Sequence, residues 1–181
     1  MAAAPPVFGS RQIQAALATF LSPRSVIVGV GNLTSSDDRF GPAVIESLRG
    51  RCPAALLDAG LTPENYAQRI VALRPSSVLV LDAAEVGLRR GELALCEPDC
   101  LDGGLDTHGG SLLLLARYLQ VAADAPVRFL LAQRECTARG RGRSVRTRVP
   151  PRGTSRGRDP TMRTVVARAT RLVRGAFVDH A

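Results

Sequence analysis

Residues 78–84 read Val-Leu-Val-Leu-Asp-Ala-Ala, an apolar run that ends on a carboxylate and two alanines. A continuous apolar run of this length is typical of a strand that is buried on both faces, as in a parallel sheet. A carboxylate at the end of such a strand is costly unless another group pairs with it. We therefore expect a central strand on which Asp82 acts either as a loop cap or as a site residue.

Further strands and helices alternate around this segment. Short apolar runs predict strands over residues 26–30, 54–57, 92–95 and 127–131. Apolar residues recur at helical spacing over residues 11–21, 42–49, 62–74, 109–121 and 160–173. The alternation predicts a three-layer α/β/α fold: a single domain with a mainly parallel central sheet of about five strands and helices on both faces.

One of these helices has a marked beginning. Thr62-Pro63-Glu64 combines a capping hydroxyl, a proline suited to a first turn and a first-turn acid. Pro75 marks the other end of the pattern. The sequence therefore predicts a capped helix between these positions.

Composition bounds the class of protein. The chain has 181 residues, of which 45% are hydrophobic, enough for the core of one domain. No window approaches 18 consecutive apolar residues and no convincing cleavage site follows the N-terminus, so we expect a soluble, unexported, cytoplasmic protein. The four cysteines, Cys52, Cys96, Cys100 and Cys136, lack Cys-x-x-Cys spacing. We expect reduced thiols rather than a disulfide framework or a cysteine-rich metal site.

The formal charge of +8 is unevenly distributed. Residues 1–133 hold 11 Arg against 13 acidic residues, whereas residues 134–181 hold 13 Arg against 3. We assign residues 1–133 to the α/β domain, with an N-terminal helix over 11–22, residues 134–159 to an irregular Arg-, Gly- and Pro-rich segment, and residues 160–175 to a C-terminal helix. Because the basicity belongs to the tail, nucleic acid is disfavoured as the partner of the domain.

Three groups that could do chemistry fall at strand ends or helix starts. Asp37 and Asp38 lie in the loop after the first strand, Asp82 ends the central strand, and His108 precedes a helix. Carboxylates and an imidazole suit a divalent metal with open coordination positions, and the carboxyl ends of parallel strands are where such sites form. Turn and capping roles for the aspartates, and a structural role for His108, remain alternatives.

Two other kinds of site are disfavoured. A dinucleotide loop beginning at Gly29-x-Gly31 needs a third glycine where the chain has Thr34. A serine nucleophile would need a Gly-x-Ser-x-Gly turn, and Ser111 simply follows His108 at the same helix start.

Four stretches within residues 24–133 form an ordered set of motifs. They are Gly29-Val30-Gly31-Asn32 with Asp37-Asp38 and Gly41-Pro42; Thr62-Pro63-Glu64-Asn65; Leu79-Val80-Leu81-Asp82-Ala83-Ala84 with Gly87 and Gly91-Glu92; and Thr107-His108. Together they resemble the hydrogenase maturation endopeptidases, most closely the branch that matures hydrogenase 3.

The resemblance implies a three-layer α/β protease that removes a C-terminal peptide from the large-subunit precursor of a nickel-iron hydrogenase after nickel insertion. It implies that Asp38, Asp82 and His108 contact the metal, and that Asp38 or Asp82 helps to move a proton. Nickel would be the metal cofactor, supplied by the substrate and serving as the recognition signal. The precursor is then the expected partner, and no membrane insertion is expected.

The chain departs from the family pattern in two places. Arg39 stands where the family often has Gly, and Leu131-Ala132-Gln133-Arg134 replaces a Gly-Ile-Gln-Pro-like turn. Because the Arg-rich segment over 134–159 does not resemble the family tail, we interpret it as an insertion or an altered reading frame. A catalytically silent relative that binds a metallated partner, or a nucleic-acid-binding module that acts through this tail, therefore remains an alternative function.

Overall fold

A computed structural model describes residues 7–34, 38–101, 109–134 and 162–177. Asp37, His108 and nearly all of the segment predicted to be irregular lie outside the described residues. Within the described part, no helix is long and apolar enough to cross a membrane.

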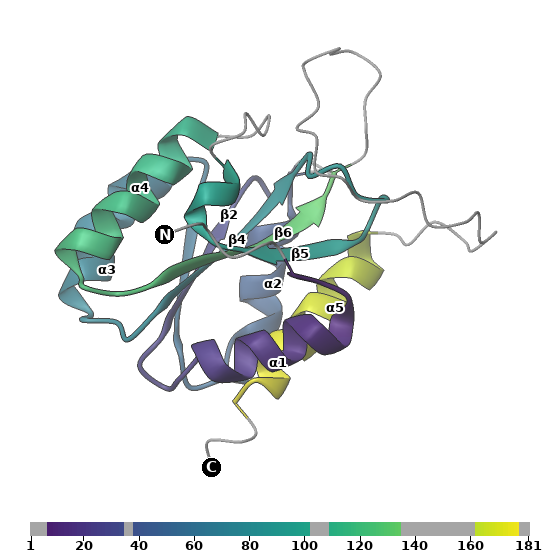
Figure 1. The fold of residues 1–181 in the computed structure, drawn as a ribbon, viewed down its shortest axis with the longest axis horizontal. Coiled ribbons are helices and arrows are strands. Elements are labelled where there is room, and N and C mark those ends of the chain that lie inside the picture. Colours follow the sequence, from purple (N-terminus) through teal and green to yellow (C-terminus); the bar gives the residue numbers. More distant parts are fainter. Residues whose placement is uncertain (1–6, 35–37, 102–108, 135–161, 178–181) are drawn as a thin grey trace.

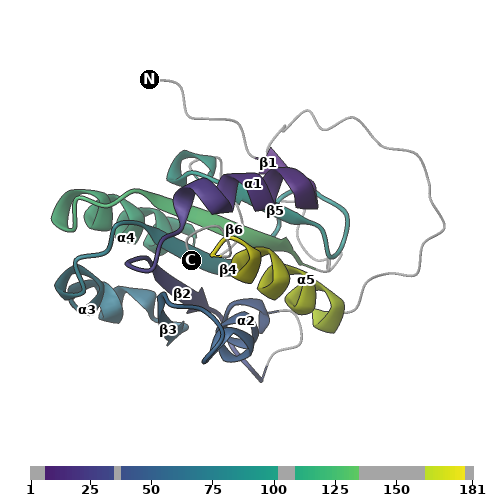
Figure 2. The same ribbon diagram turned by 90° about the horizontal axis from the view of Figure 1, so that it is seen from below.

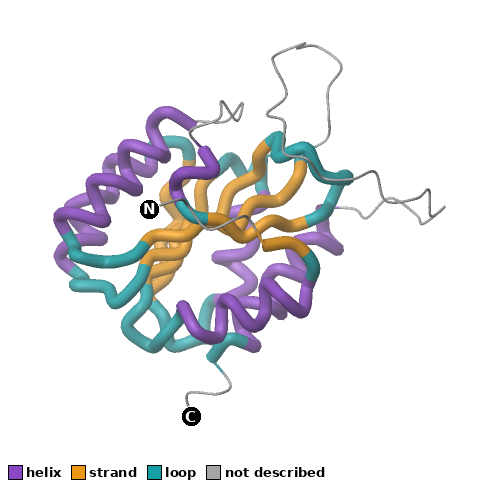
Figure 3. The backbone as a smooth tube through the Cα atoms, viewed as in Figure 1, coloured by secondary structure: helices purple, strands orange, loops and turns teal. Residues whose placement is uncertain are grey.

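The centre of the structure is a six-stranded sheet with the order β1-β5-β6-β4-β2-β3. Figure 3 shows these strands in orange, with helices in purple around them. Its strands are β1 (Val7–Phe8), β2 (Val26–Val30), β3 (Ala55–Gly60), β4 (Val78–Ala84), β5 (Leu93–Cys96) and β6 (Val127–Gln133). Strands β3, β2, β4 and β6 are parallel, while β5 and β1 are added antiparallel at one edge. The five predicted strands and the mainly parallel sheet are confirmed, and β1 is a sixth strand that is too short for a periodic signal.

Helices cover both faces of the sheet (Figures 1 and 2). On one face lie α1 (Ser10–Phe20), α2 (Phe40–Leu48) and α5 (Met162–Gly175). On the other lie the short helices η1 (Pro63–Tyr66) and η2 (Pro98–Leu101) with α3 (Ala67–Ala72) and α4 (Gly109–Ala122). The predicted three-layer α/β/α fold is therefore confirmed.

The central strand β4 contributes to two separate cores because its side chains alternate between the faces. Leu79 and Leu81 pack in the cluster beneath α1, α2 and α5, whereas Val78 and Val80 pack beneath α3 and α4. All of β4 is buried. This two-sided burial explains why the sequence of β4 is a continuous apolar run rather than an alternating one.

The helix predicted after Thr62 is divided in the structure. It begins as the 3-10 turn η1, in which Asn65 N donates to the Thr62 carbonyl at 3.1 Å, and continues as α3. Pro63 occupies the expected first position, but the side chain of Thr62 makes no capping hydrogen bond. The capping signals thus located the beginning of the helix but not its tight first turn.

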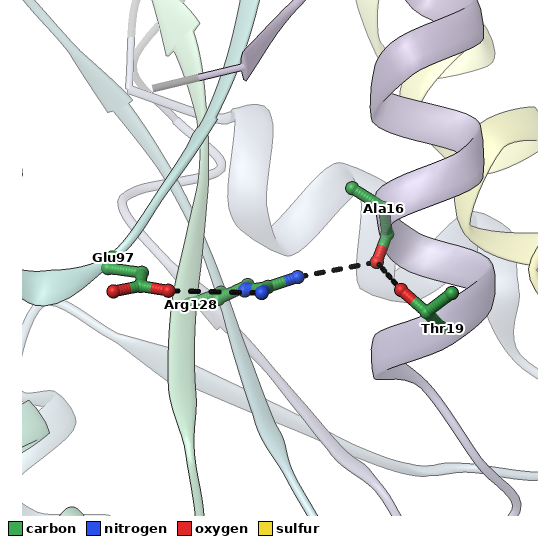
Figure 4. Close-up of polar contacts among 4 residues, drawn as sticks. All are labelled: Ala16, Thr19, Glu97 and Arg128. Carbon is green, nitrogen blue, oxygen red and sulfur yellow. Dashed lines mark hydrogen bonds and ion pairs between the residues drawn. The ribbon is translucent and has the colours of Figure 1, made fainter. Parts of the chain in front are cut away.

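Arg128 on β6 forms a polar contact between the sheet and α1 (Figure 4). Its guanidinium donates to the Ala16 carbonyl at 3.3 Å, lies 3.8 Å from a Glu97 carboxylate oxygen, and is stacked 4.7 Å above the Phe20 ring. The Ala16 carbonyl also accepts a hydrogen bond from the Thr19 hydroxyl at 3.1 Å. One side chain thereby joins the sheet, α1 and the segment after β5.

Cys96 and Cys100 form a disulfide between the end of β5 and η2, with Cα atoms 6.2 Å apart. The expectation that these two cysteines are reduced is therefore wrong. The two cysteines are four positions apart in the sequence, and the η2 turn brings their Cα atoms within bridging distance. Cys52 has a free thiol.

Helix α2 packs unusually close to the sheet. A Cβ atom built on Gly41 would lie 2.4 Å from the carbonyl oxygens of both Leu81 and Val30, which belong to β4 and β2. A Cβ atom on Gly29 of β2 would in turn lie 2.7 Å from the backbone of Gly41. Two glycines facing each other therefore allow α2 to lie directly on two strands.

We predict that Gly41→Ala destabilises the protein by about 3 kcal/mol or more, because the new methyl group meets backbone atoms that cannot rotate away. Gly175→Ala in α5 is the matched control, since its new methyl group meets only the flexible end of Gln14. Urea unfolding should show a control change within about 1 kcal/mol of the wild type. Equal effects of the two substitutions would contradict the close α2 packing.

Candidate functional site

The order of the strands creates a natural binding position between β2 and β4. The chain leaving β2 passes through α2 to β3 on one side, whereas the chain leaving β4 continues to β5 and β6 on the other (Figure 1). In open α/β sheets, ligands bind outside the carboxyl ends of strands where the connections diverge in this way. Asp38 follows β2 and Asp82 lies near the end of β4, so both predicted aspartates are at this position.

The turn between β2 and α2 holds Asp38 through its backbone. The Asp38 carbonyl accepts a hydrogen bond from Asn32 N at 2.9 Å. Gly31 has φ +128, and a Cβ atom there would lie 2.0 Å from the same carbonyl oxygen. Asn32 Oδ1 in turn accepts hydrogen bonds from the backbone and hydroxyl of Thr34 at 2.9 and 2.7 Å. A side chain at position 31 would displace Asp38.

Asp82 is completely buried on β4. Its Oδ1 accepts a hydrogen bond from Ala83 N at 2.8 Å. Burial raises the pKa of the carboxyl group from 3.8 to about 7; the hydrogen bond from Ala83 opposes this shift, the charge of Asp38 adds to it, and the charge of Arg134 opposes it. Folding therefore destabilises the ionised form of this carboxyl group relative to its protonated form.

Each aspartate has one oxygen without a partner. Asp38 Oδ1 and Asp82 Oδ2 are the buried side-chain polar atoms that have no hydrogen-bond partner in the described part of the chain. Native proteins leave few such atoms, and each one calls for an explanation. The charge of Asp38 also helps to raise the pKa of Asp82, so the two carboxyl groups interact electrostatically. Two unpaired carboxylate oxygens at one sheet edge are suitable ligands for a divalent cation.

The third predicted ligand, His108, lies outside the described residues. Helix α4 begins at Gly109, immediately after it in the sequence. Among the residues that the structure describes, no group of three His, Cys, Asp or Glu side chains could hold a metal ion. The structure thus brings two of the three predicted site residues together, and the metal set stays a prediction.

Gln133 borders the site, although no role was predicted for it from the sequence. It is buried at the end of β6, and its Oε1 accepts hydrogen bonds from Val86 N at 2.9 Å and Leu88 N at 3.0 Å. Its amide nitrogen donates to the Arg134 carbonyl at 3.0 Å. Gln133 thereby fixes the loop that follows β4. A polar residue ending an apolar strand, the same signal as at Asp82, could have identified it.

Comparison with known proteins gives relatives of one kind, although no family model matches the chain. The hydrogenase 3 maturation protease of Escherichia coli K12 is 38% identical over 80 residues, which are 41% of this chain and 49% of that protein. The chain thus spans about half the length of the curated relatives it matches.

Solved structures extend the similarity. A crystal structure of the hydrogenase 3 maturation protease is 31% identical, with a TM-score of 0.55, and the match covers 61% of this chain and 73% of that one. The NiFe hydrogenase maturation protease HycI from Thermococcus kodakarensis shares the fold with a TM-score of 0.68, covering 89% of this chain and 97% of that one at 24% identity. The chain therefore belongs to the hydrogenase maturation endopeptidase family.

Proposed function

We propose that this chain is an endopeptidase that removes a C-terminal peptide from the large-subunit precursor of a nickel-iron hydrogenase after nickel insertion, and that it recognises the nickel held by that precursor. Membership of the family supports the kind of reaction and the kind of substrate. The observation that carries the proposal is the pair of buried, unpartnered oxygens, Asp38 Oδ1 and Asp82 Oδ2.

These oxygens are better explained as ligands of a cation than as hydrogen-bond acceptors within the protein, because they have no hydrogen-bond partner among the described residues. Keeping two carboxyl groups buried and adjacent is unfavourable unless a positive charge is added or one group holds a proton. A divalent ion arriving with the substrate would supply that charge, with His108 as the third ligand. A precursor without nickel would lose these bonds, so affinity for the precursor would depend on the metal.

The two aspartates have different environments, which suits them to different tasks. The bound nickel would polarise the scissile carbonyl group or a water molecule. Asp82, whose pKa is raised to about 7 by burial, can hold or release a proton near neutral pH. Asp38 follows β2, and its backbone is held by the hydrogen bond from Asn32 N and by the close approach of Gly31.

Asp38→Asn, Asp82→Asn and His108→Ala should each lower precursor cleavage by at least about a hundredfold, because each removes a ligand or a proton-transfer group. Cleavage is followed as loss of the C-terminal peptide from a nickel-loaded precursor, by intact mass. Asp124→Asn is the matched control, because Asp124 precedes β6 at the amino-terminal end of the parallel strands, away from the site. Its positive φ is one that asparagine accepts. Normal cleavage by all three site variants would refute the proposed function.

The raised pKa of Asp82 predicts a pH-dependent stability in the absence of metal. Between about pH 4 and pH 7 the folded protein keeps a proton that the unfolded chain has released, so stability should fall as the pH rises through this window. At about 1.4 kcal/mol per pKa unit, the loss is on the order of 4 kcal/mol.

This pH dependence can be measured by urea unfolding at pH 5 and pH 8 in the presence of EDTA. Asp82→Asn should lose most of the difference between the two pH values, because asparagine does not titrate. Asp124→Asn should retain it. An unchanged difference in Asp82→Asn would show that Asp82 is not the titrating group.

A further inference from the structure

Two exposed leucines lie beyond the carboxyl ends of the parallel strands, as Asp38 and Asp82 do. Leu33 is 43% exposed and follows β2, while Leu61 is 48% exposed and follows β3. The other large apolar side chains that are exposed in the described part are Leu73, which directly follows α3, and three residues of α4: Leu114, Tyr118 and Val121. Only the first two follow strands whose carboxyl ends border the candidate site.

Backbone hydrogen bonds fix both leucines relative to Asp38. Leu33 lies within the turn that Asn32 closes, and Asn32 N donates to the Asp38 carbonyl. Leu61 follows Gly60, whose carbonyl accepts a hydrogen bond from Gly31 N at 2.9 Å. The same short backbone segment thus positions Asp38 and connects the two strand ends that carry the leucines. Both exposed leucines therefore lie next to hydrogen-bonded backbone.

The edge continues from Leu61 toward the beginning of α4. Thr62 N donates to the Ala59 carbonyl at 3.4 Å, and η1 begins at Pro63. Within η1, Glu64 accepts a hydrogen bond from the Ser111 hydroxyl in the first turn of α4 at 3.3 Å. Hydrogen-bonded segments therefore connect the turn after β2, through Leu61 and η1, to the beginning of α4.

We propose that Leu33 and Leu61 form an apolar docking edge for the substrate polypeptide, receiving apolar side chains next to the scissile bond. The inference rests on the proposed function and adds the chemistry of the recognised segment. Neighbouring strands lie about 4.8 Å apart, and an extended peptide advances about 3.4 Å per residue. A peptide that extends from Asp38 and Asp82 toward β3 would place its next one or two residues over the ends of β2 and β3.

The substrate is the expected occupant of this edge, because the backbone that carries the two leucines is hydrogen-bonded to the turn that carries Asp38. Burying apolar surface on both partners stabilises the complex, whereas a polar peptide segment would leave the leucines uncovered and gain nothing from them. The contact is the same before and after bond cleavage begins, so it contributes to binding rather than to the chemical step.

The test uses the full chain and a nickel-loaded precursor. Leu33→Ser and Leu61→Ser should each raise KM about tenfold and leave kcat within about twofold, the signature of a uniform binding contact. Leu33→Met should keep the wild-type KM. Leu73→Ser and Val121→Ser are matched controls, because both side chains are exposed and lie on or beside helices away from this edge. An unchanged KM in both edge variants, or equal effects in the controls, would overturn the proposal.

A binding measurement separates this inference from the proposed function. Fluorescence anisotropy of a labelled nickel-loaded precursor reports affinity even if the wild-type chain does not cut it, which would refute the proposed function alone. Weaker binding by Leu33→Ser and Leu61→Ser, with normal binding by Leu73→Ser, supports the docking edge. If the wild type does not bind the precursor, or if Leu33→Ser and Leu61→Ser bind it as tightly as the wild type, the docking edge is wrong. It is also wrong if sedimentation shows that the wild type is a dimer and that these two variants are monomers, because a second copy of the chain would then cover the leucines.

Discussion

The close contact of α2 with β2 and β4 is the constraint on which the rest of the site depends. Gly41 leaves no space for a side chain between the helix and the two strands, and Gly29 leaves none on the opposite side. Asp38 lies three residues before Gly41 and is held from the other direction by Gly31 and Asn32. The position of its carboxylate relative to Asp82 therefore follows from how closely the backbones pack.

The same packing makes the site energetically unfavourable in the free protein. It buries two neighbouring carboxyl groups, leaves an oxygen of each without a hydrogen bond, and raises the pKa of Asp82 to about 7. Such local costs are common where a structure is built for a ligand rather than for stability. Hydrogen bonds from Val86 N and Leu88 N to Gln133 hold the loop that follows β4, next to Asp82.

The centre of the sheet was predictable because β2, β4 and β6 are buried on both faces, and such burial leaves a continuous apolar signal in the sequence. Asp82 was identifiable for the related reason that a carboxylate interrupts such a signal. Features set by backbone geometry were not predictable: the 3-10 turn after Thr62, the Cys96–Cys100 disulfide and the fixed exposure of Leu33 and Leu61. Each depends on which atoms a turn brings together, and residue type alone does not determine that.

In the proposed function, Asp38 and Asp82 are ligands of a metal that the substrate carries. X-ray absorption of nickel in the precursor, before and after addition of the chain, tests this most directly. The predicted result is a gain of oxygen and nitrogen ligands around nickel that the Asp38→Asn, Asp82→Asn double variant fails to produce. Nickel coordination that is unchanged when the wild-type complex forms would contradict it.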